Sequence, residues 1–227
     1  MPPIAAIFPG QGSHAEGMDE PFRGSRALER GLELLGFDPF EHLDLGTRYQ
    51  QPAIFLCSVA AWEQREDDEL PVAAAGHSLG EYAALVAAGV LDFDDALPLV
   101  AERAAAMADA GERAGGGMVA MLGGDDHEIR ALAARLGLTV ANDNAPGQLV
   151  LSGATEAVAA AEEVAREETG ARARRLPVSG AFHSPLMEPA AERLAAALAE
   201  VELRPGAFPV YSNGSAAPFV DVRRGLQ

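Results

Sequence analysis

The chain has 227 residues, 48% of them hydrophobic, so it is long enough to form one large or two small globular cores. Its 34 acidic and 17 basic residues give a formal net charge of −17, which argues against a nucleic-acid-binding or anionic-membrane-binding surface. No apolar run reaches the ~20 residues of a membrane span and the sequence begins without a signal-peptide pattern, so we expect a cytoplasmic protein.

The cysteine and histidine residues argue against two further classes of protein, those held together by disulfides and those that bind a metal. The single cysteine, Cys57, cannot form an internal disulfide, and its apolar neighbours predict a buried thiol. Cysteine, histidine and carboxylate residues nowhere follow the spacing of metal ligands. We therefore expect neither a disulfide scaffold nor a bound metal.

The first third of the chain predicts a strand, a glycine-rich loop and two helices. Residues 4–8 form a short apolar run, and two glycines flank Gln11 in the loop that follows. This loop is either a simple strand-to-helix turn or a place where the backbone approaches a ligand. The pattern then predicts a helix over 26–35 and a second over 53–64, with Pro52 opening the second one.

Gly76-His77-Ser78-Leu79-Gly80 lies between an apolar run and an amphipathic run, so it predicts a strand, a sharp turn and a helix. A serine on such a turn needs small neighbours because the strained backbone leaves no room for a Cβ, and this pattern is the G-x-S-x-G nucleophile elbow. Ser78 is then a nucleophile at a helix N-terminus, where free N–H groups favour negative charge. An ordinary loop serine is the alternative.

The next helix is expected to be capped near Asp92 and to continue to about Ala110. Pro98 would strain its first turns, so the helix either starts late or is kinked. Arg103 lies on this helix, and taken alone a helical arginine is most often solvated.

Three consecutive glycines, 115–117, mark a domain boundary. Behind them the pattern predicts strands and helices in the order β-α-β-β-α-β, which is that of a ferredoxin-like unit. The expected elements are 118–122, 126–136, 138–141, 148–152, 155–168 and 173–178, with a turn at 142–147. We expect a small domain over 116–183, inserted into a large α/β domain formed by 1–115 and 184–227.

A serine nucleophile needs a base within hydrogen-bond reach. His183 is the first candidate, because it stands at a loop-to-helix junction and follows Ser78 as the base does in hydrolase-type folds. His77 adjoins Ser78, but neighbouring side chains on such a turn point apart. The remaining histidines are His14, His42 and His127.

Five blocks together resemble the malonyl-CoA:acyl carrier protein transacylases, and the acyltransferase domains of fatty-acid and polyketide synthases are similar. These blocks are Phe8-Pro9-Gly10-Gln11-Gly12-Ser13, Gln51-Pro52-Ala53, Gly76-His77-Ser78-Leu79-Gly80-Glu81-Tyr82, Arg103 and Ser179-Gly180-Ala181-Phe182-His183-Ser184-Pro185-Leu186-Met187. They follow the family's order over nearly the whole chain. The resemblance implies a hydrolase-like large domain with a mainly parallel sheet, a ferredoxin-like small domain, and an active site in the cleft between them.

The resemblance also implies a ping-pong acyl transfer in fatty-acid or polyketide synthesis. Ser78, with His183 as general base, would take the malonyl group from malonyl-CoA and pass it to the phosphopantetheine thiol of an acyl carrier protein. The N–H groups of Leu79 and Gln11 would hold the oxyanion, and Arg103 would pair with the free malonyl carboxylate. Malonyl-CoA enters as a substrate, and no permanently bound cofactor is expected.

Three further expectations come from the resemblance and from charge. Phe182 resembles the bulky residue of malonyl-selective members, where it would exclude an α-methyl group. The family continues beyond the point where this sequence ends, so we expect its C-terminal elements to be missing and apolar sheet surface to be exposed. Arg172, Arg174 and Arg175 form either a carrier-docking patch or a solvated edge strand.

Two other functions remain open. A serine hydrolase such as a thioesterase would use the same serine and histidine but release the acyl group to water. An inactive, truncated carrier-binding fragment would bind a carrier protein without labelling of its serine.

Overall fold

The computed structural model describes residues 3–66 and 69–226, and it divides into two compact units. Unit 1 comprises Met1–Ala105 and Arg193–Gln227, and unit 2 comprises Ala106–Glu192. Both boundaries fall inside helices, α4 (Phe93–Ala114) and α7 (Glu188–Ala199). They differ from the glycine-run and histidine-loop boundaries expected from the sequence, because Ala106, Ala110 and Ala190 pack with the core of unit 2.

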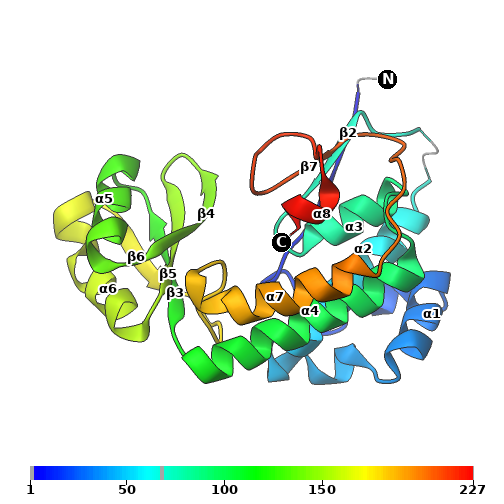
Figure 1. The fold of residues 1–227 in the computed structure, drawn as a ribbon, viewed down its shortest axis with the longest axis horizontal. Helices are drawn as coiled ribbons and strands as arrows, with labels where there is room; N and C mark the ends of the chain where they lie inside the picture. Colours follow the sequence, from blue (N-terminus) through cyan, green and yellow to red (C-terminus); the bar gives the residue numbers. More distant parts are fainter. Residues whose placement is uncertain (1–2, 67–68, 227) are drawn as a thin grey trace. The chain divides into compact units, whose positions relative to one another are not determined.

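A three-stranded parallel sheet forms the centre of unit 1, in the order β1-β2-β7 (Figure 1). Its strands are β1 (Ala5–Phe8), β2 (Ala73–Gly76) and β7 (Val210–Tyr211). The register runs from Ala5 opposite Ala73 to Phe8 opposite Gly76, and Ala75 also lies opposite Tyr211. Because the strands are parallel, the residues that follow each of them meet at one edge of the sheet.

Helices of unit 1 pack on this sheet and on one another, and their bounds test the sequence predictions. The helices are α1 (Arg26–Leu35), α2 (Thr47–Glu63), α3 (Gly80–Ala87) and α8 (Val222–Gly225), with 3-10 segments η1 (Glu20–Phe22) and η2 (Pro39–Leu45). The prediction for α1 is confirmed: the Ser25 hydroxyl caps it by accepting from Leu28 N, and Gly36 ends it in a left-handed conformation with φ 70°.

The predicted start of α2 is wrong. The helix begins at Thr47, so Pro52 lies inside it rather than at its first position. A proline there lacks one helical N–H donor. Burial offsets that loss, because Gln51 and the residues from Pro52 to Ala60 are all buried. Pro98 likewise lies inside α4, which starts at Phe93.

Unit 2 contains a four-stranded antiparallel sheet in the order β4-β5-β3-β6, as expected for a ferredoxin-like unit. Its elements are β3 (Gly117–Leu122), α5 (Asp126–Leu136), β4 (Thr139–Ala145), β5 (Gln148–Gly153), α6 (Thr155–Thr169), β6 (Arg172–Arg175) and η3 (Pro185–Met187). The turn expected over 142–147 is confirmed but is shorter: β4 continues to Ala145 with two register shifts against β5, and Pro146 and Gly147 form the turn.

Alternate residues of β3 face two different cores. Val119 and Met121 pack with α5 and α6, which lie together on one side of the sheet in Figure 1. Met118 and Ala120 pack with the cluster that includes Phe182. The loop that carries His183 is thus anchored to the core of unit 2.

One face of the unit 1 sheet exposes apolar side chains, as expected from the sequence. Ile7, Ala75 and Tyr211 are aligned across the three strands. Ile7 is 80% exposed and Tyr211 is 41% exposed. Parallel sheets are ordinarily covered on both faces, so this row is an unusual surface.

The structure also tests the expectations for the cysteine and for membrane spans. Cys57 is buried, as expected, and burial raises the pKa of its thiol to about 12. Across the described residues, every helix is either too short or too polar to cross a bilayer.

Candidate active site

Ser78 lies on the predicted strand-turn-helix elbow, between β2 and α3. Its φ of 50° places a non-glycine residue in the left-handed region, which is a strained conformation. The flanking glycines are sterically required: a Cβ on Gly76 would lie 1.9 Å from Gly80 C, and one on Gly80 would lie 2.3 Å from Phe8 O. The elbow interpretation of the sequence is confirmed by this geometry.

The loop after β1 packs directly on the elbow. His77 N donates to Phe8 O at 3.0 Å, and a Cβ on Gly10 would lie 2.3 Å from His77 O. In the part of the chain that the structure describes, no backbone hydrogen bond is assigned to Gln11 N or Leu79 N. Their role as oxyanion donors stays a prediction.

Polar side chains of α2 fix the side chain of Gln11. Thr47 Oγ1 donates to Gln11 Oε1 at 2.6 Å, and Gln11 Nε2 donates to Gln50 Oε1 at 3.2 Å. Gln51 Nε2 donates to Thr47 Oγ1 at 2.8 Å. Both side-chain ends of Gln11 are thus engaged on α2.

Arg103 is buried rather than solvated, although it lies on a helix. Its side chain is 8% exposed, and its Nη2 donates to Ser78 Oγ at 2.9 Å. The Nη1 atom donates to the fully buried Gln51, and the guanidinium carbon lies 5.7 Å from the centre of the Tyr82 ring. A fixed, buried cation therefore stands beside the candidate nucleophile.

Asn213 is a site residue that sequence reasoning missed. Its Oδ1 accepts from Ser78 N at 3.0 Å, its Nδ2 donates to Gly76 O at 2.6 Å, and its backbone N donates to Glu81 Oε1 at 2.6 Å. The sequence signal that could have found it is its place two residues after β7, at the edge where the ends of parallel strands meet.

Glu81 is a buried carboxylate next to the elbow. Burial raises the pKa of Glu81, and hydrogen bonds from Asn213 and the charge of Arg103 oppose that rise. The same burial raises the pKa of Tyr82 to about 12, so this phenol stays neutral.

His183 and Phe182 belong to unit 2, and their pairing with the residues of unit 1 stays a prediction. His183 is exposed and has a φ of 57°, another strained left-handed conformation. Ser184 Oγ fixes the loop by donating to Ala181 O at 2.6 Å. Phe182 is 4% exposed and packs in the core cluster of unit 2 with Met118 and Val150.

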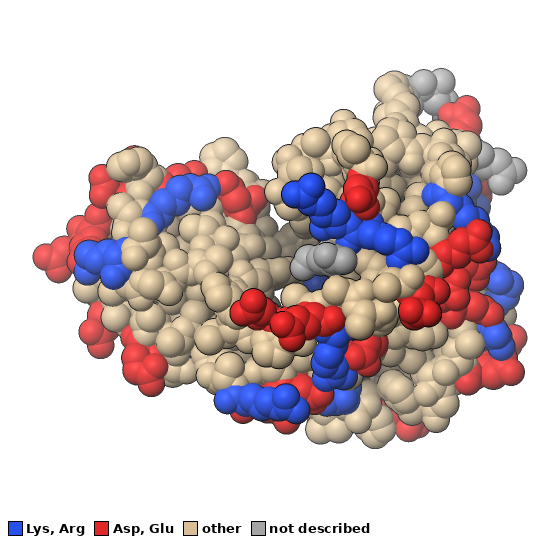
Figure 2. Space-filling model, viewed as in Figure 1, with Lys and Arg blue, Asp and Glu red and all other residues tan. Residues whose placement is uncertain are grey.

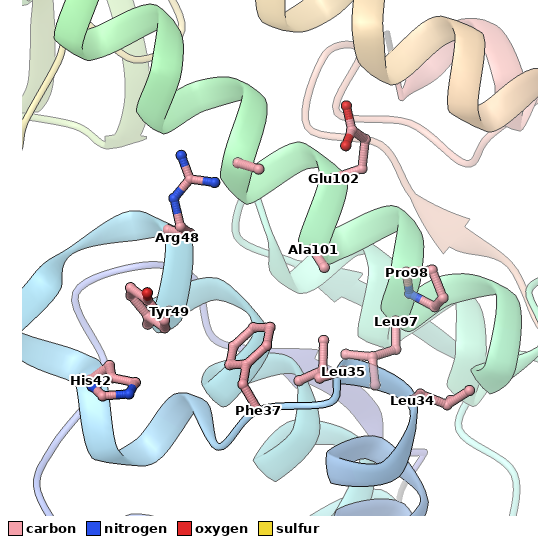
Figure 3. Close-up of a pocket in the computed structure, with 11 residues that line it drawn as sticks. Leu34, Leu35, Phe37, His42, Arg48, Tyr49, Leu97, Pro98, Ala101 and Glu102 are labelled. Carbon is pink, nitrogen blue, oxygen red and sulfur yellow. The ribbon is translucent and has the colours of Figure 1, made fainter.

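A separate pocket in unit 1 contains none of these residues (Figure 3). It has a volume of about 560 Å³, and the rings of Phe37, His42 and Tyr49 line one side of it, whereas Leu97 and Pro98 of α4 line another. We do not place the acyl site there, because neither Ser78 nor Gln11 borders it. In residues 3–66 and 69–226, no three potential metal ligands gather.

The three arginines of β6 lie on an edge strand of unit 2. Arg175 Nε lies 3.2 Å from Glu162 Oε2, and Figure 2 shows both basic and acidic side chains on the visible face of this unit. The edge-strand interpretation is confirmed, and a carrier-docking role stays a prediction.

Comparisons with known proteins agree on one family. The acyl transferase domain family matches residues 40–221. The malonyl CoA-acyl carrier protein transacylase of Bacillus subtilis is 40% identical over an alignment of 235 positions, gaps included, and the alignment covers 95% of this chain and 74% of that protein.

Two solved structures give the same result. One is the malonyl CoA-acyl carrier protein transacylase of Coxiella burnetii, with a TM-score of 0.89, 36% identity and coverage of 99% of this chain and 78% of that chain. The other is a malonyl-transacylase in complex with its type II polyketide synthase acyl-carrier protein, with a TM-score of 0.91, 34% identity and coverage of 99% and 79%.

Proposed function

The chain belongs to the acyl transferase family of malonyl-CoA:acyl carrier protein transacylases, and we propose that it transfers a malonyl group from coenzyme A to an acyl carrier protein. The reaction serves fatty-acid or polyketide synthesis in the cytoplasm. The single observation that carries the substrate assignment is the buried Arg103 guanidinium, 2.9 Å from Ser78 Oγ. A planar fork at this place suits the free carboxylate of a malonyl group attached to the serine.

The first half-reaction forms an ester on Ser78. Ser78 Oγ attacks the thioester carbonyl as His183 takes its proton, and the tetrahedral oxyanion accepts hydrogen bonds from Leu79 N and Gln11 N. When the carbon–sulfur bond breaks, His183 returns the proton to the coenzyme A thiolate. Loss of one oxyanion donor costs about 3 kcal/mol in comparable sites.

The second half-reaction reverses this chemistry with a different thiol. His183 takes the proton of the phosphopantetheine thiol of the carrier, and the sulfur attacks the carbonyl of the malonyl ester. When the carbon–oxygen bond to Ser78 breaks, His183 returns that proton to Ser78 Oγ. The chain's own groups supply the nucleophile, base, oxyanion donors and carboxylate partner, so we propose that no bound cofactor or metal is needed. We further propose that Phe182 favours malonyl over methylmalonyl substrates, because its bulky ring would exclude an α-methyl group.

The test is acyl transfer to a holo carrier protein. Incubation with malonyl-CoA, removal of free coenzyme A and then addition of holo carrier should give malonyl-carrier and restore the unmodified enzyme. Apo carrier, which lacks the thiol, is the matched control and should leave the enzyme acylated. Loss of the malonyl group to water before any carrier is added would support the hydrolase alternative instead.

A further inference from the structure

Asn213 completes the sheet at the elbow with its side chain instead of its backbone. In a parallel ladder, one residue donates to the carbonyl before its opposite neighbour and accepts from the amide after it. The Asn213 amide does both around His77, because Nδ2 donates to Gly76 O and Oδ1 accepts from Ser78 N. The backbone pairing of β2 with β7 stops just before this point, at Ala75 and Tyr211.

The orientation of this amide follows from its partners. Gly76 O can only accept and Ser78 N can only donate, so Nδ2 and Oδ1 cannot exchange places. The backbone of Asn213 is held as well, since its N–H donates to Glu81 Oε1. Asn213 therefore ties the last residue of β2, the nucleophile and the first turn of α3 to one point.

We propose that Asn213 is a positioning residue that holds Ser78 in its strained, reactive conformation. The proposal rests on the proposed function, because it assigns Asn213 a role in acylation of Ser78. A left-handed serine at φ 50° persists only where its surroundings hold it. The Asn213 side chain bonds the backbone on both sides of His77, so we expect it to act through the Ser78 backbone.

The test compares single-turnover acylation by malonyl-CoA in wild type and in Asn213→Ala. We expect the acylation rate constant to fall about tenfold to a hundredfold, because a small displacement of a reacting group has that effect, with little change in the malonyl-CoA concentration that gives the half-maximal rate. Asn213 is exposed, so its truncation leaves no core cavity and the variant should fold. An unchanged rate constant in a folded Asn213→Ala protein would overturn the proposal.

Asn213→Asp separates positioning from general stability by its pH profile. An ionised carboxyl can accept from Ser78 N but cannot donate to Gly76 O, whereas a protonated one can do both. The charged and titratable groups nearby are Glu81, which accepts from Asn213 N, Arg103, which donates to Ser78 Oγ, and His77 between the two side-chain bonds of Asn213, and variant and wild type share all three. The ratio of variant to wild-type acylation rate should therefore rise as pH falls, and a flat ratio would contradict the proposal.

Val210→Ala is the matched control on the same strand. Val210 is 4% exposed and pairs with Ala74, so its truncation weakens β7 without removing an elbow hydrogen bond. We expect a lower melting temperature with near wild-type acylation. If acylation is slowed equally in Val210→Ala and Asn213→Ala, Asn213 has only a structural role and the proposal fails. If wild type itself is not acylated, the proposed function fails instead, so the two failures are distinguishable.

Discussion

Arg103 connects the candidate nucleophile to the polar side chains of α2. Its two terminal nitrogens donate to Ser78 Oγ and to Gln51, so its position is fixed before substrate binds. A lysine could replace the charge but not the planar fork. Substrate choice should therefore depend on this side chain more than on any apolar contact.

We predict that Arg103→Lys lowers kcat/KM for malonyl-CoA about a hundredfold, which corresponds to about 3 kcal/mol for a weakened buried charge pair. Acetyl-CoA has no free carboxylate, so the kcat/KM for its transfer should be reduced far less. Steady-state kinetics with both thioesters measures this difference. Arg26→Lys, which changes an arginine paired with Glu63 at the surface, is the control. An equal loss of kcat/KM for both thioesters would contradict the role of Arg103 in binding the carboxylate.

Glu81 should make the stability of the fold depend on pH in a defined direction. Burial raises the pKa of Glu81 above its ordinary value of 4.5, so the folded state binds a proton more readily than the unfolded chain. The stability contribution of the protonated form is thus lost as pH rises from about 4.5 through the folded-state pKa.

We predict that Glu81→Gln removes this part of the pH dependence while still accepting from Asn213 N. Urea unfolding at several pH values should show that the free energy of unfolding of wild type falls, relative to the variant, as pH rises through this window. Parallel curves for the two proteins would show that Glu81 does not titrate there.

At the scale of elements, the elbow depends on glycines that allow β1, β2 and α3 to approach closely. A Cβ on Gly80 would lie 2.3 Å from Phe8 O and 2.8 Å from Pro9 O, and both are backbone atoms that cannot rotate away. We predict that Gly80→Ala destabilises the fold by about 3 kcal/mol and lowers the melting temperature. Gly117→Ala is the control, since nothing lies within 4 Å of its added Cβ. Equal melting temperatures for the two variants would contradict this account.

Helices whose ends are marked by capping residues could be predicted from the sequence. Helix α5 was expected at 126–136 and is observed there, because the Asp125 carboxylate caps its start and Gly137 ends it in a left-handed conformation. The start of α2 was missed, since proline usually opens a helix and nothing local reveals that tertiary burial tolerates Pro52 inside one. Asn213 was missed for a related reason: its partners lie 132 to 137 residues away and meet it only through the parallel pairing of β2 and β7.

In the candidate site too, local sequence patterns predict some features and long-range contacts decide others. The elbow at Ser78 is encoded by five adjacent residues and was recognised from them alone. The burial of Arg103 was not predictable from its own helix, because it depends on Gln51 and Tyr82, which come from two other helices. The local patterns could be recognised in the sequence, whereas the long-range polar contacts could be identified only from the structure.

At the scale of the whole molecule, the exposed apolar row of the unit 1 sheet should govern solution behaviour. We predict concentration-dependent self-association of the wild-type chain through Ile7 and Tyr211, because exposed apolar sheet surface is removed from water on contact. Ile7→Thr keeps the β-branched shape but adds a hydroxyl, and it should shift sedimentation-velocity profiles towards monomer.

Val220→Thr is the matched control for that experiment. Val220 is 102% exposed but lies outside the sheet, so its substitution should leave the association unchanged. A wild-type chain that stays monomeric over a wide concentration range would refute the prediction. Equal effects of the two substitutions would show that general surface hydrophobicity, not the sheet face, is responsible.

The central claim is that Ser78 becomes acylated by malonyl-CoA. Intact mass after a brief incubation, with peptide mapping of the modified site, tests this on wild type and Ser78→Ala. We expect one malonyl group on wild type, mapped to Ser78, and none on the variant. Absence of the adduct from folded wild-type protein, or an adduct that persists in Ser78→Ala, would contradict the account.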